Sequence, residues 1–558
     1  MILVNMDIGG DLCWQSSFIN RASVHHEERV KYIPIRRTTI SISATVVVPN
    51  GLATSEAESA FIVSLAQFGV QYILHYILSL GSTVIIPTLL VPQMGGSDKD
   101  KAKVIQTLLF VSGVNTLLHS LFGTRLPSVI GGSYAFLIPA TSIIQSRRYA
   151  TLHPPELRFV LTMRGIQGAL IMSSCFQMVF GFTGLWRNIT RLLTPLSTAP
   201  LVTFTGLGLY YLGFPQIAKC FEVGIPELVL ILVISQILPK YIKLKRPVLD
   251  RYSLLISLAF VWIYAEILTL SGAFNKTKQS SCRTDGSGLI SSAPWFYAPF
   301  PFQWGPPTFN GGETFAAMIA SFVALTESTG SLVAAARYGS ATPVPPSVIS
   351  RGVGWLGIGT LLNALFGSIT CSTVSVENVG LLALTKAGSR RIIQYSSLFM
   401  IFFSIFGKFG AVFASMPLPI IAASYCIFLG YVSSAGLGYL QFCNLNSFRT
   451  KLILGFSFFV GISLPQYFRE NHANTGTGPL HTPARWFNDM ISVMLMSHAT
   501  VAGLVALVLD CSLDRSTEQA RKDNGSFWWD KFVAYAKDVR NNEFYKLPGK
   551  LNSCFPSF

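Results

Sequence analysis

The segment 372–388 reads STVSVENVGLLALTKAG, and its irregularity indicates the kind of fold to expect. It is apolar enough to lie inside a membrane, but it is short and is interrupted by Gly, Ser and Thr. A second segment of this kind, at 128–146, reads SVIGGSYAFLIPATSIIQS. An ordinary spanning helix needs about 20 consecutive apolar residues, so we predict that both segments are irregular membrane elements.

Longer apolar runs surround these two segments, and we interpret each as a membrane span. They lie near 61–91, 104–123, 163–186, 192–213, 225–239, 253–273, 313–336, 353–370, 394–414, 418–440, 452–466 and 488–511. The irregular segments are then the third and tenth of about fourteen elements, at equivalent positions of two halves. Broken segments at matching positions point to a transporter site between inverted repeats. We therefore predict an all-α polytopic membrane protein with about 14 transmembrane segments in two inverted 7-segment repeats.

The same runs divide the chain into five predicted regions. Residues 1–58 form a cytoplasmic N-terminal arm, predicted to be poorly ordered, and 512–558 form a cytoplasmic C-terminal tail. The first repeat covers 59–273 and the second covers 313–511. An extracellular loop at 274–312 connects them.

Lys and Arg residues set the predicted orientation, because they concentrate in cytoplasmic loops. The strongest signal is the run KYIKLKR at 240–246, in a gap assigned to the inside. Both termini are therefore predicted to be cytoplasmic, with the plasma membrane as the expected location. Asn275, in the motif Asn-Lys-Thr of the outer loop, is a candidate for glycosylation.

The composition supports this class and excludes others. The 558 residues are 50% hydrophobic and only 12% charged, against about 25% charged in soluble domains. This disfavours a cytosolic enzyme, a disordered chain and a fibrous repeat. We assign the net charge of +16 to loops that face anionic lipid, not to nucleic-acid binding, because no basic patch is interleaved with aromatic residues. No nucleophile elbow, phosphate loop or metal-ligand spacing appears, so neither an enzyme nor a metal site is predicted.

The nine cysteines show no CxxC pair and no accompanying His cluster. Most lie in apolar runs, where a thiol behaves as a small hydrophobic group. Cys282 lies in a polar loop and is open to oxidation, but the sequence does not indicate its partner.

Among the ionisable residues inside predicted membrane elements, the candidates for a function are His75, Glu266, Glu327 and Glu377. Such residues cost about 2.5–3.5 kcal/mol at a helix centre, so each one suggests a function. Glu327 is compatible with two roles, a hydrogen-bond acceptor for a neighbouring helix or a ligand that takes up a proton. Glu266 favours an interfacial or pairing role, and His75 suits packing better than ligand binding.

The broken segments themselves carry the remaining candidates. Glu377 and Asn378 offer adjacent acceptors and donors that suit the edge of a planar heterocycle, although they also suit a helix N-cap. Gly380 allows close backbone approach to a ligand. In the third element, Ser133 and Tyr134 follow two glycines and provide backbone amides and an aromatic face; glycines in such a run also serve ordinary helix packing.

At these positions the chain resembles the nucleobase–ascorbate transporter family, and specifically its plant branch. The family signature is an acid, amide or proline followed by Asn-x-Gly-x-x-x-x-Thr-x-x-x-Gly, and it is complete from Glu377 through Thr385 to Gly388. Further similar stretches are Gln106–Phe110, Phe122–Pro127, Pro301–Gly305, Glu327–Gly330 and Asn541–Tyr545.

The resemblance implies a fold with core and gate domains, strand-containing third and tenth elements, and a homodimer. It also implies the roles of individual residues. Glu327 and Glu377 would bind substrate and couple its entry to protons, with His75 in support. The remaining substrate-binding residues would be Asn378, Ser133, Tyr134, Gly380 and Thr385.

The resulting prediction is a secondary active transporter that moves nucleobases together with protons. Its substrates would be purines such as xanthine, uric acid, adenine and guanine, or uracil, and the proton would be its only cofactor. Ser331 stands where some relatives carry a second ionisable residue, which favours protons over sodium. Ascorbate transport is the alternative within this class. A non-transporting membrane protein on the same fold is another, because Leu74 stands where the family often has Gln.

Overall fold

The computed structural model describes residues 72–79, 81–150, 154–242, 248–274, 282–284, 294–386, 388–408, 416–475, 478–513, 517–533, 540–548 and 551–555. The predicted N-terminal arm at 1–58 and Asn275 lie outside these residues. So does most of the basic run at 240–246.

The first half of the described chain is almost entirely helical. It begins with a helix at Tyr72–Met94. The elements that follow are α3 (Asp98–Phe122), β1 (Ile130–Gly132), α4 (Leu137–Ile144), α5 (Arg147–Ala150), α6 (Pro155–Phe182), α7 (Leu185–Leu192), α8 (Pro195–Leu207), α9 (Phe214–Ile217), α10 (Phe221–Leu232), α11 (Leu238–Tyr241) and α12 (Val248–Leu270). A π-helical stretch at Val233–Ile237 joins α10 to α11.

The second half repeats this pattern and ends in a short helical tail. Its elements are α14 (Gly311–Tyr338), α15 (Pro346–Phe366), β2 (Ser372–Val374), α16 (Val376–Thr385), α17 (Arg390–Ile405), α19 (Leu418–Leu437), α20 (Phe448–Thr475), α21 (Arg485–Leu495), α22 (His498–Ser512), α23 (Glu518–Asp523), α24 (Ser526–Val533) and α25 (Arg540–Tyr545).

Local sequence explains where several of these helices begin. Ser97 and Asp100 form a reciprocal capping box at the start of α3. The Asn310 side chain accepts hydrogen bonds from the amides of Gly312 and Glu313 at the start of α14. Helices α6, α8, α15 and α19 start with Pro in the first turn, where its missing N–H costs nothing.

The chain is a multi-pass membrane protein. The described residues contain nine helices long and apolar enough to cross a membrane, or eleven if each of two bent pairs counts as one span. The bent pairs are α7 with α8–α9, at 106°, and α21 with α22, at 77°. Shorter apolar helices lie at Tyr134–Ile144 and Val376–Thr385, within the two segments predicted to be irregular. The predicted total of fourteen spans stays a prediction.

The helix packing has the exchange symmetry of two inverted repeats. Helix α3 packs against α17 and α6 packs against α15. Among the fourteen predicted elements, α3 and α17 are the second and eleventh, and α6 and α15 are the fourth and ninth. Moving each element of the first pair to its counterpart in the other half therefore produces the second pair. Helix α8 packs against α19, its own counterpart, and β1 pairs with its counterpart β2. The β1–β2 pairing is antiparallel, as inverted halves require.

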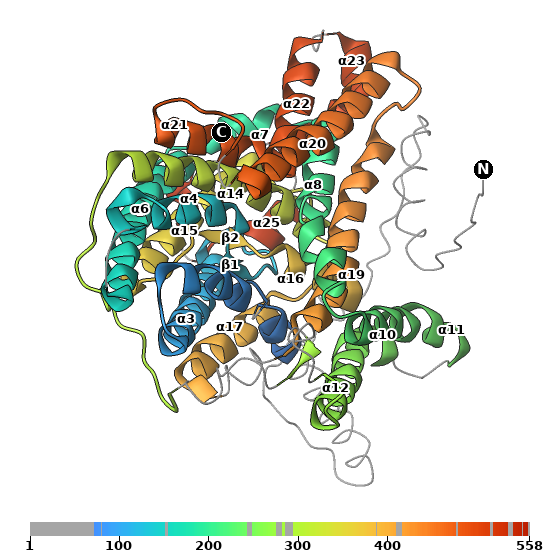
Figure 1. Ribbon diagram of the computed structural model, residues 1–558. Coiled ribbons are helices and arrows are strands. Elements are labelled where there is room, and N and C mark those ends of the chain that lie inside the picture. The colour runs from blue at the N-terminus through green and yellow to red at the C-terminus, as the bar shows by residue number, and fades with distance from the viewer. Residues whose placement is uncertain are drawn as a thin grey trace, which may run out of the picture. The chain divides into compact units, whose positions relative to one another are not determined.

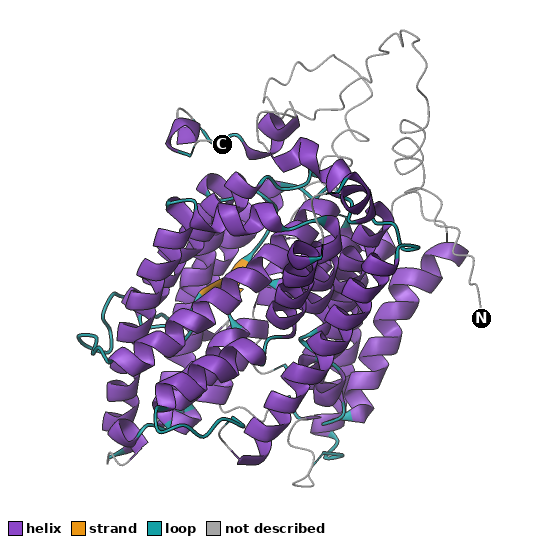
Figure 2. Ribbon diagram, turned by 90° about the horizontal axis from the view of Figure 1, so that it is seen from above, coloured by secondary structure: helices purple, strands orange, loops and turns teal. Residues whose placement is uncertain are grey.

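The two strands meet in the middle of the surrounding helices (Figures 1 and 2). Their register pairs Ile130 with Val374 and Gly132 with Ser372, and all six strand residues are buried. Non-helical backbone at membrane depth is tolerated only where the protein satisfies its polar groups. Hydroxyl groups from neighbouring helices do so here: the Ile130 amide donates to Thr116 Oγ1 at 2.9 Å, and the Val374 amide donates to Ser328 Oγ at 3.2 Å.

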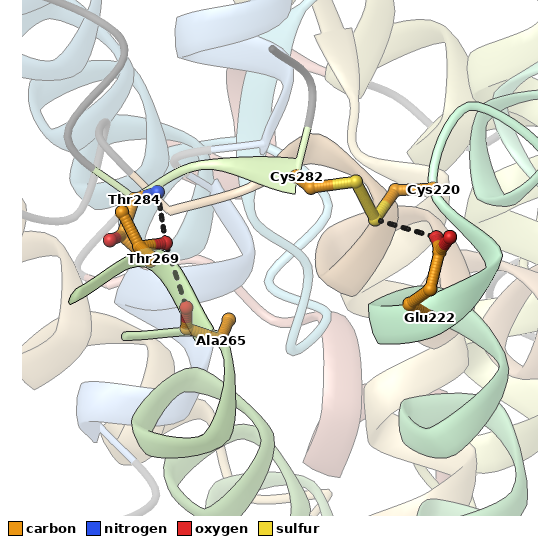
Figure 3. The surroundings of a disulfide bond; sticks show 6 residues. All are labelled: Cys220, Glu222, Ala265, Thr269, Cys282 and Thr284. Atoms are coloured by element: carbon orange, nitrogen blue, oxygen red, sulfur yellow. Dashed lines mark hydrogen bonds between the residues drawn. A yellow bond between two sulfur atoms is a disulfide. The ribbon is translucent and has the colours of Figure 1, made fainter. Parts of the chain in front are cut away.

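A disulfide supplies the partner of Cys282 that the sequence did not indicate. Cys282 is bonded to Cys220, which lies between α9 and α10, 62 positions earlier (Figure 3). Beside it, Thr284 donates a hydrogen bond to Glu266 near the end of α12. The loop that follows α12 is therefore tied to α10 covalently and to α12 by hydrogen bonding, and Glu266 has the pairing role that was favoured for it.

Candidate functional site

A cavity of about 160 Å³ lies between the broken third element and α14 on one side and α8, α20 and α22 on the other. Its apolar and aromatic wall comes from Tyr134, Ala135, Leu137, Ile138, Phe204, Leu209, Tyr211, Val323, Val493, Met496 and Ala499. Its polar lining comes from Thr205, Glu327, Arg469, Ser497 and His498, with Gly208 between α8 and Leu209. An apolar pocket with a few convergent polar groups is the usual form of a small-molecule site.

Glu327 is the acid of this cavity. It lies in the middle of α14, and its Oε1 accepts a hydrogen bond from Ser497 Oγ at 2.9 Å. Ser497 is also the N-cap of α22, because its side chain accepts the Thr500 amide at 3.3 Å. The carboxylate is therefore held by a residue from the opposite wall.

Tyr134 connects the cavity to a buried polar cluster behind it. Tyr134 lines the cavity, and its side chain interacts with the Glu377 carboxyl group and with the Tyr425 side chain. Glu377 is only 2% exposed and is not part of the cavity lining. Of the two predicted acids, Glu327 therefore lines the cavity, and Glu377 is buried behind Tyr134.

The start of α16 organises this cluster. Ser375 caps the helix by accepting the Asn378 amide at 3.4 Å, and its hydroxyl donates to Glu377 Oε2 at 2.8 Å. The Asn378 side chain donates from Nδ2 to Ser375 Oγ and lies 2.9 Å from His75 Nδ1 through its Oδ1. The N-cap of α16 is therefore Ser375, and Glu377 and Asn378 lie in the first turn of the helix, where His75 contacts the Asn378 side chain.

The other predicted residues lie away from the cavity lining. Ser133 is buried, its Oγ accepts the Ala135 amide at 3.3 Å, and its own amide donates to Thr370 Oγ1 at 3.0 Å. Gly380 faces α19, where an added Cβ would lie 2.4 Å from the Phe428 carbonyl oxygen. Thr385 Oγ1 donates to the Leu381 carbonyl within α16. These three residues shape the elements around the site.

Sequence reasoning missed four polar residues of the cavity: Thr205, Arg469, Ser497 and His498. The apolar run was assigned to 452–466, whereas the helix that can span the membrane extends over Phe448–Asn474. Arg469 therefore lies within a span, three residues beyond the predicted end. Its guanidinium carbon is 4.0 Å from the Tyr211 ring centroid and 5.8 Å from that of Tyr210. A longer window over this run is the signal that identifies it as an intramembrane cation.

Three comparisons place the chain among known proteins. A family model described as "Permease family" matches residues 63–470. Nucleobase-ascorbate transporter 7 of Arabidopsis thaliana is 58% identical over 486 residues, which are 87% of this chain and 90% of that protein. Putative nucleobase-ascorbate transporter 10 of the same plant is 59% identical over 493 residues, or 87% and 91%. Nucleobase-ascorbate transporter LPE1 of Zea mays is 52% identical over 486 residues, or 87% and 92%.

Similarity to solved structures is remote. The transmembrane domain of the cyanobacterial bicarbonate transporter BicA is 13% identical, with a TM-score of 0.40, and the match covers 70% of this chain and 93% of that domain. The structure of SLC26A9 is 12% identical with the same TM-score and covers 78% of this chain and 70% of that one.

Proposed function

The chain belongs to the plant nucleobase–ascorbate transporters of the permease family, and from that premise we propose that it moves nucleobases across a membrane together with protons. The observation that carries the proposal is the position of Glu327. Its carboxylate lies inside a span, lines the cavity and accepts a hydrogen bond from Ser497 on the opposite wall. The proposed substrates are purines such as xanthine, uric acid, adenine and guanine, or uracil.

The chemistry of a carboxyl group supports coupling at this position. In its ionised form Glu327 only accepts hydrogen bonds, and Ser497 satisfies one of its oxygens. In its protonated form it also donates one, so gaining a proton changes what the cavity offers to the edge of a heterocyclic ring. Tyr134 and Tyr211 add aromatic faces on which a planar ring can stack.

The two walls of the cavity suggest how access alternates. One wall belongs to the third element and α14, and the other to α8, α20 and α22. We propose that the first group moves as a core against the second as a gate, with Glu327 carrying proton and substrate between the two sides. The Ser497–Glu327 contact would break and re-form in each cycle.

The disulfide supports the proposed orientation. Cys220 and Cys282 lie in two loops predicted to face outward, and disulfides persist in oxidising environments. We therefore propose that this side is extracellular, that both termini are cytoplasmic, and that the membrane is the plasma membrane. We retain the predicted homodimer as part of the proposal.

Ascorbate is the second candidate substrate, and Arg469 favours it. A cation in the cavity suits an anionic ligand, whereas two carboxylates near one another would oppose it. Arg469 therefore favours ascorbate, whereas the carboxylates favour the neutral bases.

Uptake by whole cells tests the proposal. Yeast without its own nucleobase carriers would express the protein and be offered radiolabelled xanthine, uric acid, adenine, guanine, uracil and ascorbate, with and without a proton uncoupler. We expect uncoupler-sensitive uptake of at least one base, and its loss in Glu327→Ala with surface expression retained. Glu156→Gln, in the exposed first turn of α6, is the control and should transport normally. Unchanged uptake in Glu327→Ala would contradict the proposal.

A further inference from the structure

Arg469 brings a positive charge into the cavity, and the proposed transport of nucleobases with protons does not use it. Among the residues that line the cavity, Glu327 and Arg469 are the two with formal charges, and they come from α14 and α20. Arg469 is half-buried. A cation inside a membrane span is costly and marks a functional position by default.

Two tyrosines hold the Arg469 side chain in place. Its guanidinium group lies over Tyr211, with the central carbon 4.0 Å from the ring centroid, and is 5.8 Å from the Tyr210 ring. Tyr210 is itself hydrogen-bonded to Gln466, one turn earlier on α20. Cation–π contacts of this kind orient a guanidinium group without neutralising its charge.

Among the described residues, no acidic side chain forms an ion pair with the Arg469 guanidinium group. Glu470 accepts a hydrogen bond from Gln466 at 2.7 Å instead. Within the same described residues, Arg469 Nε is buried and makes no hydrogen bond. The guanidinium group therefore has a donor to offer to a ligand.

The charge balance of the cavity depends on Glu327. Ionised Glu327 and Arg469 cancel, and the Arg469 charge acts on the Glu327 carboxylate. When Glu327 takes up a proton, the cavity is left with one uncompensated positive charge in a medium of low dielectric constant. A singly charged anion restores neutrality there, whereas an uncharged ligand does not.

We infer that Arg469 makes this site select substrates in their singly anionic form, such as an oxopurine anion or ascorbate, over uncharged bases. The inference rests on the proposed function, because it concerns the substrate of the same cavity. The planar guanidinium fork matches two neighbouring oxygen atoms of such an anion. Proton uptake by Glu327 and anion binding at Arg469 then favour one another.

Direct binding tests the inference independently of transport. The purified full-length chain would be titrated with radiolabelled uric acid and ascorbate, which are anions at neutral pH, and with adenine, which is uncharged. We expect wild-type protein to bind at least one of the two anions, and their relative affinities to identify which anion the site prefers. Arg469→Gln should weaken binding of that anion about tenfold or more, which corresponds to about 1.4 kcal/mol, and should leave adenine binding within about twofold.

Two further variants guard against a folding defect. Arg469→Lys keeps the charge but loses the planar fork, so its anion affinity should lie between those of wild type and Arg469→Gln. Arg337→Gln removes an arginine stacked on Tyr439 at 5.5 Å, outside the cavity lining, and should bind as wild type does. Equal weakening of anion and adenine binding in Arg469→Gln, or no anion binding by wild type, would overturn the inference.

The uptake assay separates this inference from the proposed function. If purified protein binds the anion through Arg469 but cells show no uncoupler-sensitive uptake, proton-coupled transport is wrong and the assignment of Arg469 holds. If uptake is uncoupler-sensitive but Arg469→Gln binds the anions as tightly as wild type, the assignment of Arg469 is wrong and transport holds.

Discussion

Ser497 donates a hydrogen bond to Glu327 across the cavity, with 2.9 Å between Oγ and Oε1. The two residues are 170 positions apart in the chain. The same Ser497 hydroxyl accepts the Thr500 amide and caps α22. One side chain thus positions the acid of the site and starts the helix that forms part of its opposite wall.

Removing this hydroxyl should impair transport. Hydrogen bonds to charged groups contribute about 1.5–3 kcal/mol, so we expect Ser497→Ala to lower substrate uptake about tenfold or more. Ser497→Thr retains a hydroxyl for both contacts and should stay close to wild type. Because the alanine variant also loses a helix cap, Thr517→Ala, which removes the cap of α23 away from the cavity, serves as the control. Normal uptake by Ser497→Ala would contradict the role given to this contact.

His75 and Asn378 should be coupled in stability. Their side chains lie 2.9 Å apart, at Nδ1 and Oδ1, and both are buried. His75→Ala leaves the Asn378 carbonyl oxygen without this partner, which costs about 1–3 kcal/mol. We expect each single alanine variant to melt at a lower temperature than wild type in detergent. The double variant should melt well above the value that additive losses give, and strict additivity would show that the contact contributes nothing.

Gly380 should tolerate no side chain. A Cβ at this position would lie 2.4 Å from both the Cβ and the carbonyl oxygen of Phe428 on α19. Overpacking of this kind costs about 1–3 kcal/mol, and here the backbone of α19 would have to move. We expect Gly380→Ala to reduce the amount of folded protein, measured by size-exclusion chromatography of a fluorescent fusion. Gly430→Ala, where an added Cβ meets nothing within 4 Å, is the matched control on α19 and should fold normally.

The disulfide should both stabilise the protein and report which side of the membrane it faces. Linking residues 62 positions apart contributes about 2–4 kcal/mol in the chain-entropy account, so Cys220→Ser should lower the melting temperature. This variant also frees the Cys282 thiol. If the proposed orientation holds, a membrane-impermeant maleimide will label Cys282 in intact cells expressing Cys220→Ser and will not label it in wild type. Labelling only after permeabilisation would reverse the orientation.

Much of the fold was predictable because it follows from short-range patterns. Long apolar runs predict spanning helices, since a helix satisfies all its backbone hydrogen bonds within one segment of the membrane. The segments at 128–146 and 372–388 are irregular, as their interrupted apolar runs suggested, and they contain β1 and β2, which the family resemblance implied. Helix ends were less predictable. Helix α20 continues past Pro465 to Thr475, because the tertiary structure accommodates polar residues that hydropathy alone places outside the span.

The candidate site was predictable only in part. Glu327 and Tyr134 were predicted from their own segments, and both line the cavity. Arg469 was not predicted because the predicted span ended three residues before it, and Ser497 was not predicted because it stands in no unusual local pattern. Gly380 was predicted from its own segment, but the residue that packs against it was not. Its hydrogen-only side chain accommodates Phe428, which lies 48 positions later in the chain.

The sequence by itself determined the membrane class, the family and the broken third and tenth elements, because each follows from residues close together in the chain. The tertiary structure determined which polar groups meet. It joined Cys220 to Cys282, placed Glu377 behind Tyr134, and brought Arg469 and Ser497 to the cavity of Glu327. Such contacts join residues tens to hundreds of positions apart, and their partners are set by how helices pack and by which buried polar groups need satisfying.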